Sequence, residues 1–146
     1  MSSDDSGKGP LFLLMEISGS RFAFPAGRVL LVTEWTAPFS LPLGAPWLLG
    51  WLPREGRALP VVDPAHLWPG AEGASLLVLL DGDEHRYFFP GVSALFVRGT
   101  LSEPPAVAPP YVAGLLDCGQ ESHVEVFDAP LLYRSFHLGY NSPLDG

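Results

Sequence analysis

The chain has 146 residues, and its 8 Lys and Arg against 16 Asp and Glu give a net charge of −8. Hydrophobic residues make up 47% and charged residues only 16%, which argues against a disordered chain and supplies ample material for a core. Nucleic acid is a poor partner for such an acidic chain, because phosphate binding depends on clustered Lys and Arg. The single cysteine, Cys118, excludes a disulfide framework within the chain.

Membrane insertion is not expected either. The longest uncharged apolar stretch, residues 41–53, is interrupted by Gly and Pro and is shorter than the roughly 20 residues that a spanning helix needs. The acidic segment 1–10 lacks the apolar region of a secretory signal, so we expect a disordered lead there. We therefore predict a cytoplasmic protein without direct membrane insertion.

The two halves of the chain resemble each other. Residues 11–32 are similar to residues 76–97, at an offset of 65. Two later matches keep the order and nearly the same offset: 46–52 with 110–116, and 59–67 with 124–132. Three matches in register indicate an internal duplication, so we expect one domain over 11–136 with repeated subdomains at 11–68 and 76–136.

Each half carries five short segments that are rich in Val, Leu and aromatic residues and are bounded by Gly, Pro or Asp. These segments predict strands at 11–17, 21–25, 29–35, 47–52 and 57–62, then at 76–80, 85–89, 92–98, 111–116 and 123–127. A Pro-rich connection, residues 99–110, lies between the strands predicted at 92–98 and 111–116, and we place no strand in it. The pattern predicts an all-β fold of two small barrels that share a core, because neither half is large enough to bury much alone.

Helix is expected only near the end of the chain. Residues 129–136 follow Asp128, a good N-cap, and Pro130 falls in the first turn, where proline is tolerated. Asp63 and Pro64 begin a shorter equivalent in the first half. The remaining residues, 137–146, are predicted to be a frayed tail.

Catalytic motifs are weak. Asp63 and Asp128 are equivalent in the repeat, and two aspartates across a pseudo-twofold axis are the arrangement of an aspartic-type hydrolase. That chemistry also needs a small hydroxyl residue and Gly after each Asp, whereas Pro and Ala follow here, so the N-cap interpretation is favoured. The four histidines show no metal-binding spacing, and no nucleotide loop is present, so we predict no metal, no cofactor and no catalytic residue.

Aromatic residues offer a different signal. Trp47 and Tyr111 are equivalent in the repeat, so we assign both to the core. Trp35 and Trp51 have no aromatic counterpart in the second half, and unpaired aromatics on a repeated frame fit either the core or a surface for a partner.

The order of these segments resembles the CheW-like domain of bacterial chemosensory systems. The resemblance is carried by LFLLMEISGSRFAFP at 11–25, by PWLLGWLPREGRALPVVDP at 46–64, and in the second half by FFPGVSALFV, PYVAGLL and VEVFDAPLL. It covers residues 11–136 and implies two five-stranded, SH3-like β-barrels around a common core. It also implies a non-enzymatic adaptor that links the cytoplasmic tip of a chemoreceptor to the regulatory domain of a CheA-type histidine kinase.

The chain departs from the family pattern at charged positions. The family usually has Asn-x-Arg-Gly where this chain has Pro53, Arg54, Glu55 and Gly56, so a charge is reversed at Glu55. The acid of the family's third strand is replaced by Leu31. The resemblance implies that these positions face the receptor and other partners, and a changed charge requires a partner that fits it.

We therefore predict a partner-binding surface formed by Leu31, Trp51, Leu52, Arg54, Glu55, Gly56 and Arg57. An alternative is a diverged CheW-like module that serves another regulator, such as one for surface motility. A hydrolase that uses Asp63 and Asp128 is the less favoured alternative.

Overall fold

The computed structural model describes residues 9–40, 44–71 and 73–138. The predicted lead at 1–10 and tail at 137–146 lie largely outside these residues. Strands are β1 (Leu11–Ile17), β2 (Ser20–Pro25), β3 (Val29–Glu34), β4 (Leu48–Arg54), β5 (Arg57–Val62), β6 (Leu76–Gly82), β7 (His85–Gly91), β8 (Ser93–Arg98), β9 (Thr100–Ser102), β10 (Val112–Asp117) and β11 (Val124–Phe127). Two 3-10 turns, η1 (Ala26–Arg28) and η2 (Pro64–His66), and the helix α2 (Ala129–Leu138) complete the described elements.

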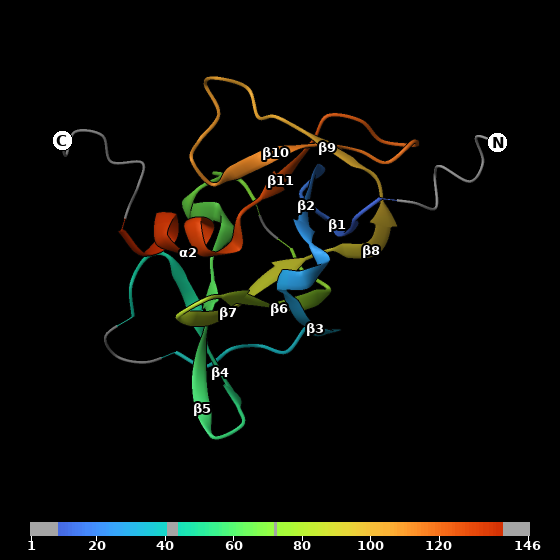
Figure 1. The fold of residues 1–146 in the computed structure, drawn as a ribbon. Coiled ribbons are helices and arrows are strands. Elements are labelled where there is room, and N and C mark those ends of the chain that lie inside the picture. The colour runs from blue at the N-terminus through green and yellow to red at the C-terminus, as the bar shows by residue number, and fades with distance from the viewer. Residues whose placement is uncertain (1–8, 41–43, 72, 139–146) are drawn as a thin grey trace.

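The strands form two sheets that repeat one topology (Figure 1). One sheet has the order β8-β1-β2-β11-β10-β9, and the other has the order β3-β6-β7-β5-β4. When each strand of the second sheet is replaced by its equivalent in the repeat, the order becomes that of the first five strands of the first sheet, β8-β1-β2-β11-β10. The prediction of an all-β fold with two pseudo-repeated, SH3-like barrels is confirmed.

Each sheet draws strands from both halves of the chain. The hairpin β1–β2 pairs with β8 on one side and with β11 on the other. Reciprocally, the hairpin β6–β7 pairs with β3 and β5. The pairings of β2 with β11 and of β5 with β7 are parallel. Each of these two hairpins thus completes a barrel whose other strands come from the other half of the chain, and we call it an exchanged hairpin.

The barrel interiors are equivalent in the repeat. One interior cluster is formed by Phe12, Ala23, Leu116, Val124 and Val126, and the other by Leu52, Val61, Leu77, Leu79 and Phe88. Four positions of each cluster correspond at the offset of 64 or 65 found in the sequence. The duplication therefore extends to the packing of side chains inside each barrel.

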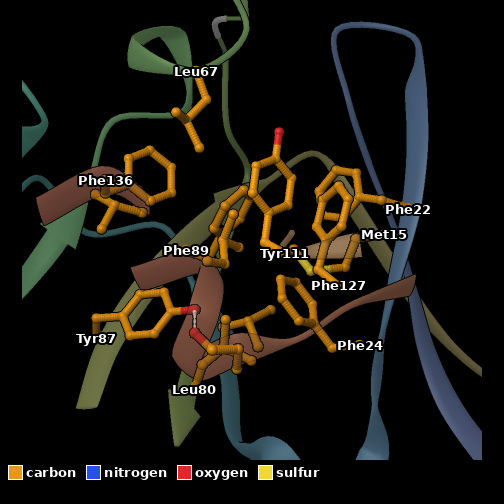
Figure 2. Close-up of a cluster of buried hydrophobic side chains, with 14 of the residues drawn as sticks. Met15, Phe22, Phe24, Leu67, Leu80, Tyr87, Phe89, Tyr111, Phe127 and Phe136 are labelled. Atoms are coloured by element: carbon orange, nitrogen blue, oxygen red, sulfur yellow. Dashed lines mark hydrogen bonds between the residues drawn. The ribbon is translucent and has the colours of Figure 1, made fainter. Parts of the chain in front are cut away.

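A third and larger cluster lies between the barrels and beneath α2 (Figure 2). The rings of Phe22 and Phe127 stack at 5.2 Å, and Trp68 stacks on Phe127 at 5.5 Å. The buried Tyr87 hydroxyl donates a hydrogen bond to the Ala129 carbonyl oxygen over 2.8 Å, which ties the start of α2 to β7. Burial of this size drives most of the folding free energy, so the barrels and the helix depend on one shared core.

Two glycines allow an additional segment to pair beside each barrel. A Cβ on Gly114 would lie 2.4 Å from the Ser102 carbonyl oxygen, and one on Gly50 would lie 2.5 Å from the Phe39 carbonyl oxygen. Ser102 belongs to β9, and Phe39 forms an isolated bridge with Trp51. The structure thus adds β9 inside the connection in which the sequence analysis placed no strand.

The close approach at the two glycines predicts a selective loss of stability. Replacing Gly114 or Gly50 by Ala forces the methyl group against a backbone carbonyl, which should lower the free energy of unfolding by about 1–3 kcal/mol. Gly27 has no atom within 4 Å of an added Cβ, so Gly27→Ala is the matched control and should change stability by less than about 0.5 kcal/mol. Urea denaturation measures the free energy of unfolding of these variants and of the control. Equal effects at Gly27 and Gly114 would contradict the packing described here.

Tyr87 provides a second test. Burial raises the pKa of its hydroxyl well above the ordinary value. The unfolded chain ionises Tyr87 near pH 10 while the folded chain does not, so this contribution to stability is present below pH 10 and is lost as the pH rises above it. Tyr87→Phe should cost about 1 kcal/mol at pH 7 through the lost hydrogen bond and should make the alkaline decline shallower. An unchanged alkaline slope in chemical unfolding would contradict a buried hydroxyl.

Candidate partner-binding surface

The hairpin β4–β5 presents most of the predicted surface. Its two-residue turn consists of Glu55 and Gly56, whose φ values of 52° and 80° both lie in the left-handed region. Such a turn matches the twist of the two strands, and it suits Gly at the second position far better than Glu at the first. Arg54 and Arg57 flank the turn and lie directly opposite each other. All four residues are exposed, and the hairpin extends away from the rest of the molecule (Figure 1).

The two predicted leucines lie beneath this surface. Leu52 is only 9% exposed and packs inside the barrel, and the half-buried Leu31 packs against the same cluster. Leu52 alternates with Trp51 along β4, so the two side chains point to opposite faces of the strand. The structure therefore brings Arg54, Glu55, Gly56 and Arg57 together at the tip, with the leucines supporting the barrel below.

Trp51 lies at the side of the hairpin. Its backbone N–H donates to the Phe39 carbonyl over 2.8 Å and its carbonyl accepts from the Phe39 N–H over 3.0 Å, while the Trp51 side chain is half-buried. Phe39 itself is 44% exposed. Trp35 and Leu49, each 37% exposed, line a hollow of about 500 Å³. Apolar side chains thus remain accessible around the barrel that contains β4.

Two aromatic residues, Trp47 and Tyr111, were predicted to lie in the core. Tyr111 is 6% exposed and belongs to the large cluster between the barrels, as predicted. Trp47 is half-buried at the edge of that cluster, with its ring 5.6 Å from Tyr133 and 5.3 Å from His137.

Edge strands add accessible apolar residues on both barrels. The edge strand β3 exposes Leu30 and Val32, and the edge strand β8 exposes Leu95 and Phe96, of which Leu95 is 62% exposed. An exposed apolar edge strand favours pairing with or packing against another protein. On these two strands the sequence predicted a surface position only at Leu31, so the exposed residues of both β3 and β8 were missed, although the two strands are equivalent in the repeat.

Asp63 and Asp128 both act as N-caps. The Asp63 carboxylate accepts a hydrogen bond from the Ala65 backbone N–H at 3.0 Å, and that of Asp128 accepts one from the Leu131 N–H at 2.9 Å. The N-cap prediction is confirmed at both positions. Two aspartates that share a proton must bond to each other, whereas here each carboxylate is engaged at the start of its own helix or turn.

Other site types find no support in the part of the chain that the structure describes. No group of three His, Cys, Asp or Glu side chains there is placed to hold a metal ion. None of the described helices is long and apolar enough to cross a membrane. Cys118 lies in a turn in which its N–H donates to the Glu121 carbonyl at 3.0 Å.

Two equivalent barrels with exchanged hairpins, a shared aromatic core and a capped terminal helix define a duplicated β-barrel module. No protein-family model matches the sequence, and no curated protein matches it. Among solved structures, the fold is similar to the scaffolding protein TtCheW from Thermoanaerobacter tengcongensis, with a TM-score of 0.72 over 82% of this chain and 89% of that one. Only 13% of the residues are identical. The chain therefore has a CheW-like fold.

The cap geometry at α2 yields a prediction. Asp128→Ala removes the acceptor for the Leu131 N–H and should cost about 1 kcal/mol of stability, within a range of roughly 0.5–2 kcal/mol. Asp128→Asn keeps a capping oxygen and should cost much less, which makes it the matched control. Thermal and urea unfolding report the difference. An Asn variant as unstable as the Ala variant would show that the charge matters and not the cap.

Proposed function

We propose that the chain is a non-enzymatic adaptor of a bacterial chemosensory pathway. In this proposal it binds the regulatory domain of a CheA-type histidine kinase and the cytoplasmic tip of a chemoreceptor. Its work is to hold these two proteins together through complementary surfaces, without transforming a molecule.

The observation that carries the proposal is the exposed tip of β4–β5, which is supported from below by a buried core. An exposed turn flanked by two Arg, with the half-buried Trp51 at its side, has the composition of a protein interface, in which a few aromatic and Arg residues dominate affinity. The likeness of the fold to a scaffolding protein supports the same conclusion. The N-cap roles of Asp63 and Asp128 account for both residues without catalysis.

Charges at the tip tune partner choice in this proposal. Glu55 sits between Arg54 and Arg57, so the tip carries a net charge of +1 on an acidic protein. Charges at the rim of an interface mainly set the association rate and exclude wrong partners. A partner that fits this chain therefore presents charges that are complementary to Arg54, Glu55 and Arg57, in that order.

The proposal predicts measurable binding of the kinase's regulatory domain. Isothermal titration with the regulatory domain of a CheA-type kinase from the same organism should give a complex at micromolar concentrations. Trp51→Ala should weaken it about tenfold or more, because a large aromatic residue of the predicted surface is lost. Arg57→Glu, an exposed change that leaves the core intact, should weaken it severalfold.

Val107 is the matched control for these variants. It is 93% exposed and lies outside the predicted surface, so Val107→Ala should bind as the natural chain does. No complex at tens of micromolar would overturn the proposal. Binding of a surface-motility regulator in place of a chemosensory kinase would instead favour the diverged module.

A further inference from the structure

Basic residues are concentrated at one corner of this acidic protein. Five of the 8 basic residues gather around the turn between β6 and β7, and they are Arg28, Arg54, Arg57, Arg86 and Arg134. Acidic residues in the same region are Glu55, Asp81, Asp83, Glu84 and Asp128. The corner therefore has 5 basic and 5 acidic residues and no net charge, whereas the rest of the chain has 3 basic and 11 acidic residues.

Three of these arginines line one hollow. Arg54, Arg57 and Arg86 surround a space of about 370 Å³ with Leu59, Glu55, Asp83 and Glu84 at its walls. The topology explains why they converge. Because β5 and β7 run parallel, with Val61 beside Phe88, both strands begin at the same edge of the sheet. This space is called the three-arginine hollow below.

The arginines of the three-arginine hollow form no close ion pair, although Glu55, Asp83 and Glu84 line the same space and Asp81 lies opposite Arg86 in the register of β6 and β7. No ion pair among the described residues includes Arg54, Arg57 or Arg86. Arg54 and Arg57 face each other across the hairpin, and like charges in directly opposed positions destabilise a sheet.

One carboxylate that lines the hollow is already engaged by an arginine outside it. Asp83 pairs with Arg28 at 2.6 Å, and its hydrogen bond raises the pKa of Arg28. The remaining acidic residues of the hollow, Glu55 and Glu84, have no ion pair with its arginines in the described chain.

We propose that the three-arginine hollow binds an acidic segment of a protein partner. The segment would present two or more Asp or Glu side chains to Arg54, Arg57 and Arg86, and a small apolar side chain to Leu59. Guanidinium groups match carboxylates through paired hydrogen bonds, which gives such a site geometric specificity. The inference rests on the proposed function in that the partner is a protein of the same assembly.

A polypeptide fits this site better than a nucleic acid does. The chain carries a net charge of −8, which repels a long polyanion. A short acidic segment interacts with the corner alone, since charges beyond about 10 Å are screened at physiological salt.

The test uses the full chain and a fluorescein-labelled peptide in which Glu and Leu alternate. Fluorescence anisotropy should show binding that weakens as salt rises from 50 to 300 mM. Arg86→Gln should reduce the affinity about threefold to fivefold, and the triple variant R54Q/R57Q/R86Q should reduce it about thirtyfold or more. Arg86 lies outside the surface predicted from the sequence, so this substitution tests the hollow specifically.

Arg98→Gln is the matched control. It removes the same charge, but Arg98 lies on β8 and donates to the Gly9 carbonyl at 2.9 Å, away from the hollow. Circular dichroism checks that all variants are folded. An Arg86→Gln affinity equal to that of Arg98→Gln would overturn the inference. So would undetectable binding of the peptide, or tighter binding of a single-stranded oligonucleotide than of the peptide.

The two proposals fail separately. If the kinase domain binds the natural chain and the peptide does not, the three-arginine hollow is not an acidic site while the adaptor function stands. If the peptide binds with the expected dependence on Arg86 and no chemosensory protein binds, the adaptor function falls while the hollow remains an acidic-segment site.

Discussion

Each barrel is completed by a hairpin from the other half of the chain, and the rest of the structure depends on this exchange. The parallel pairings of β2 with β11 and of β5 with β7 hold the exchanged hairpins in place. Because the chain must order both halves before either barrel is closed, the entropy of long-range pairing is offset only when the shared core forms. We therefore regard the two barrels as one cooperative unit, which suits a scaffold whose surfaces must keep a fixed relation.

The same exchange positions the surfaces that we propose for partners. It places the hairpin β4–β5 beside β7, so residues from both halves, Arg57 and Arg86, border the same hollow. It also leaves β3 and β8 as equivalent edges with exposed apolar residues. A duplicated module thus offers two similar edges but only one arginine-rich corner, since the second half has no counterpart of the Arg54–Arg57 tip.

Local signals in the sequence predicted the local structure well. Asp63 and Asp128 could be assigned as caps because capping depends on residues within three positions of the Asp. The offset of 65 predicted two equivalent barrels. It could not predict the exchange, because in a symmetric repeat each hairpin satisfies the same pattern with either set of partner strands.

The surface was harder to predict. Leu52 was included with Trp51 because both follow the family pattern, although alternation along a strand separates their faces and Leu116, its repeat equivalent, is buried. The strand β9 was missed because its Pro-rich surroundings suggest a loop, although Gly114 marks the close approach of Ser102. Arg86 carried no local signal, since its proximity to Arg57 depends on the parallel pairing of distant strands.

The most direct test of the adaptor role is reconstitution of kinase control. Chemoreceptor-containing vesicles, the CheA-type kinase and this chain would be combined, and the rate of kinase autophosphorylation would be measured with and without the chain. The account predicts that receptors change the kinase rate only when the chain is present, and that the change depends on the concentration of the chain. A kinase rate that receptors leave unaltered at every concentration of the chain would contradict it.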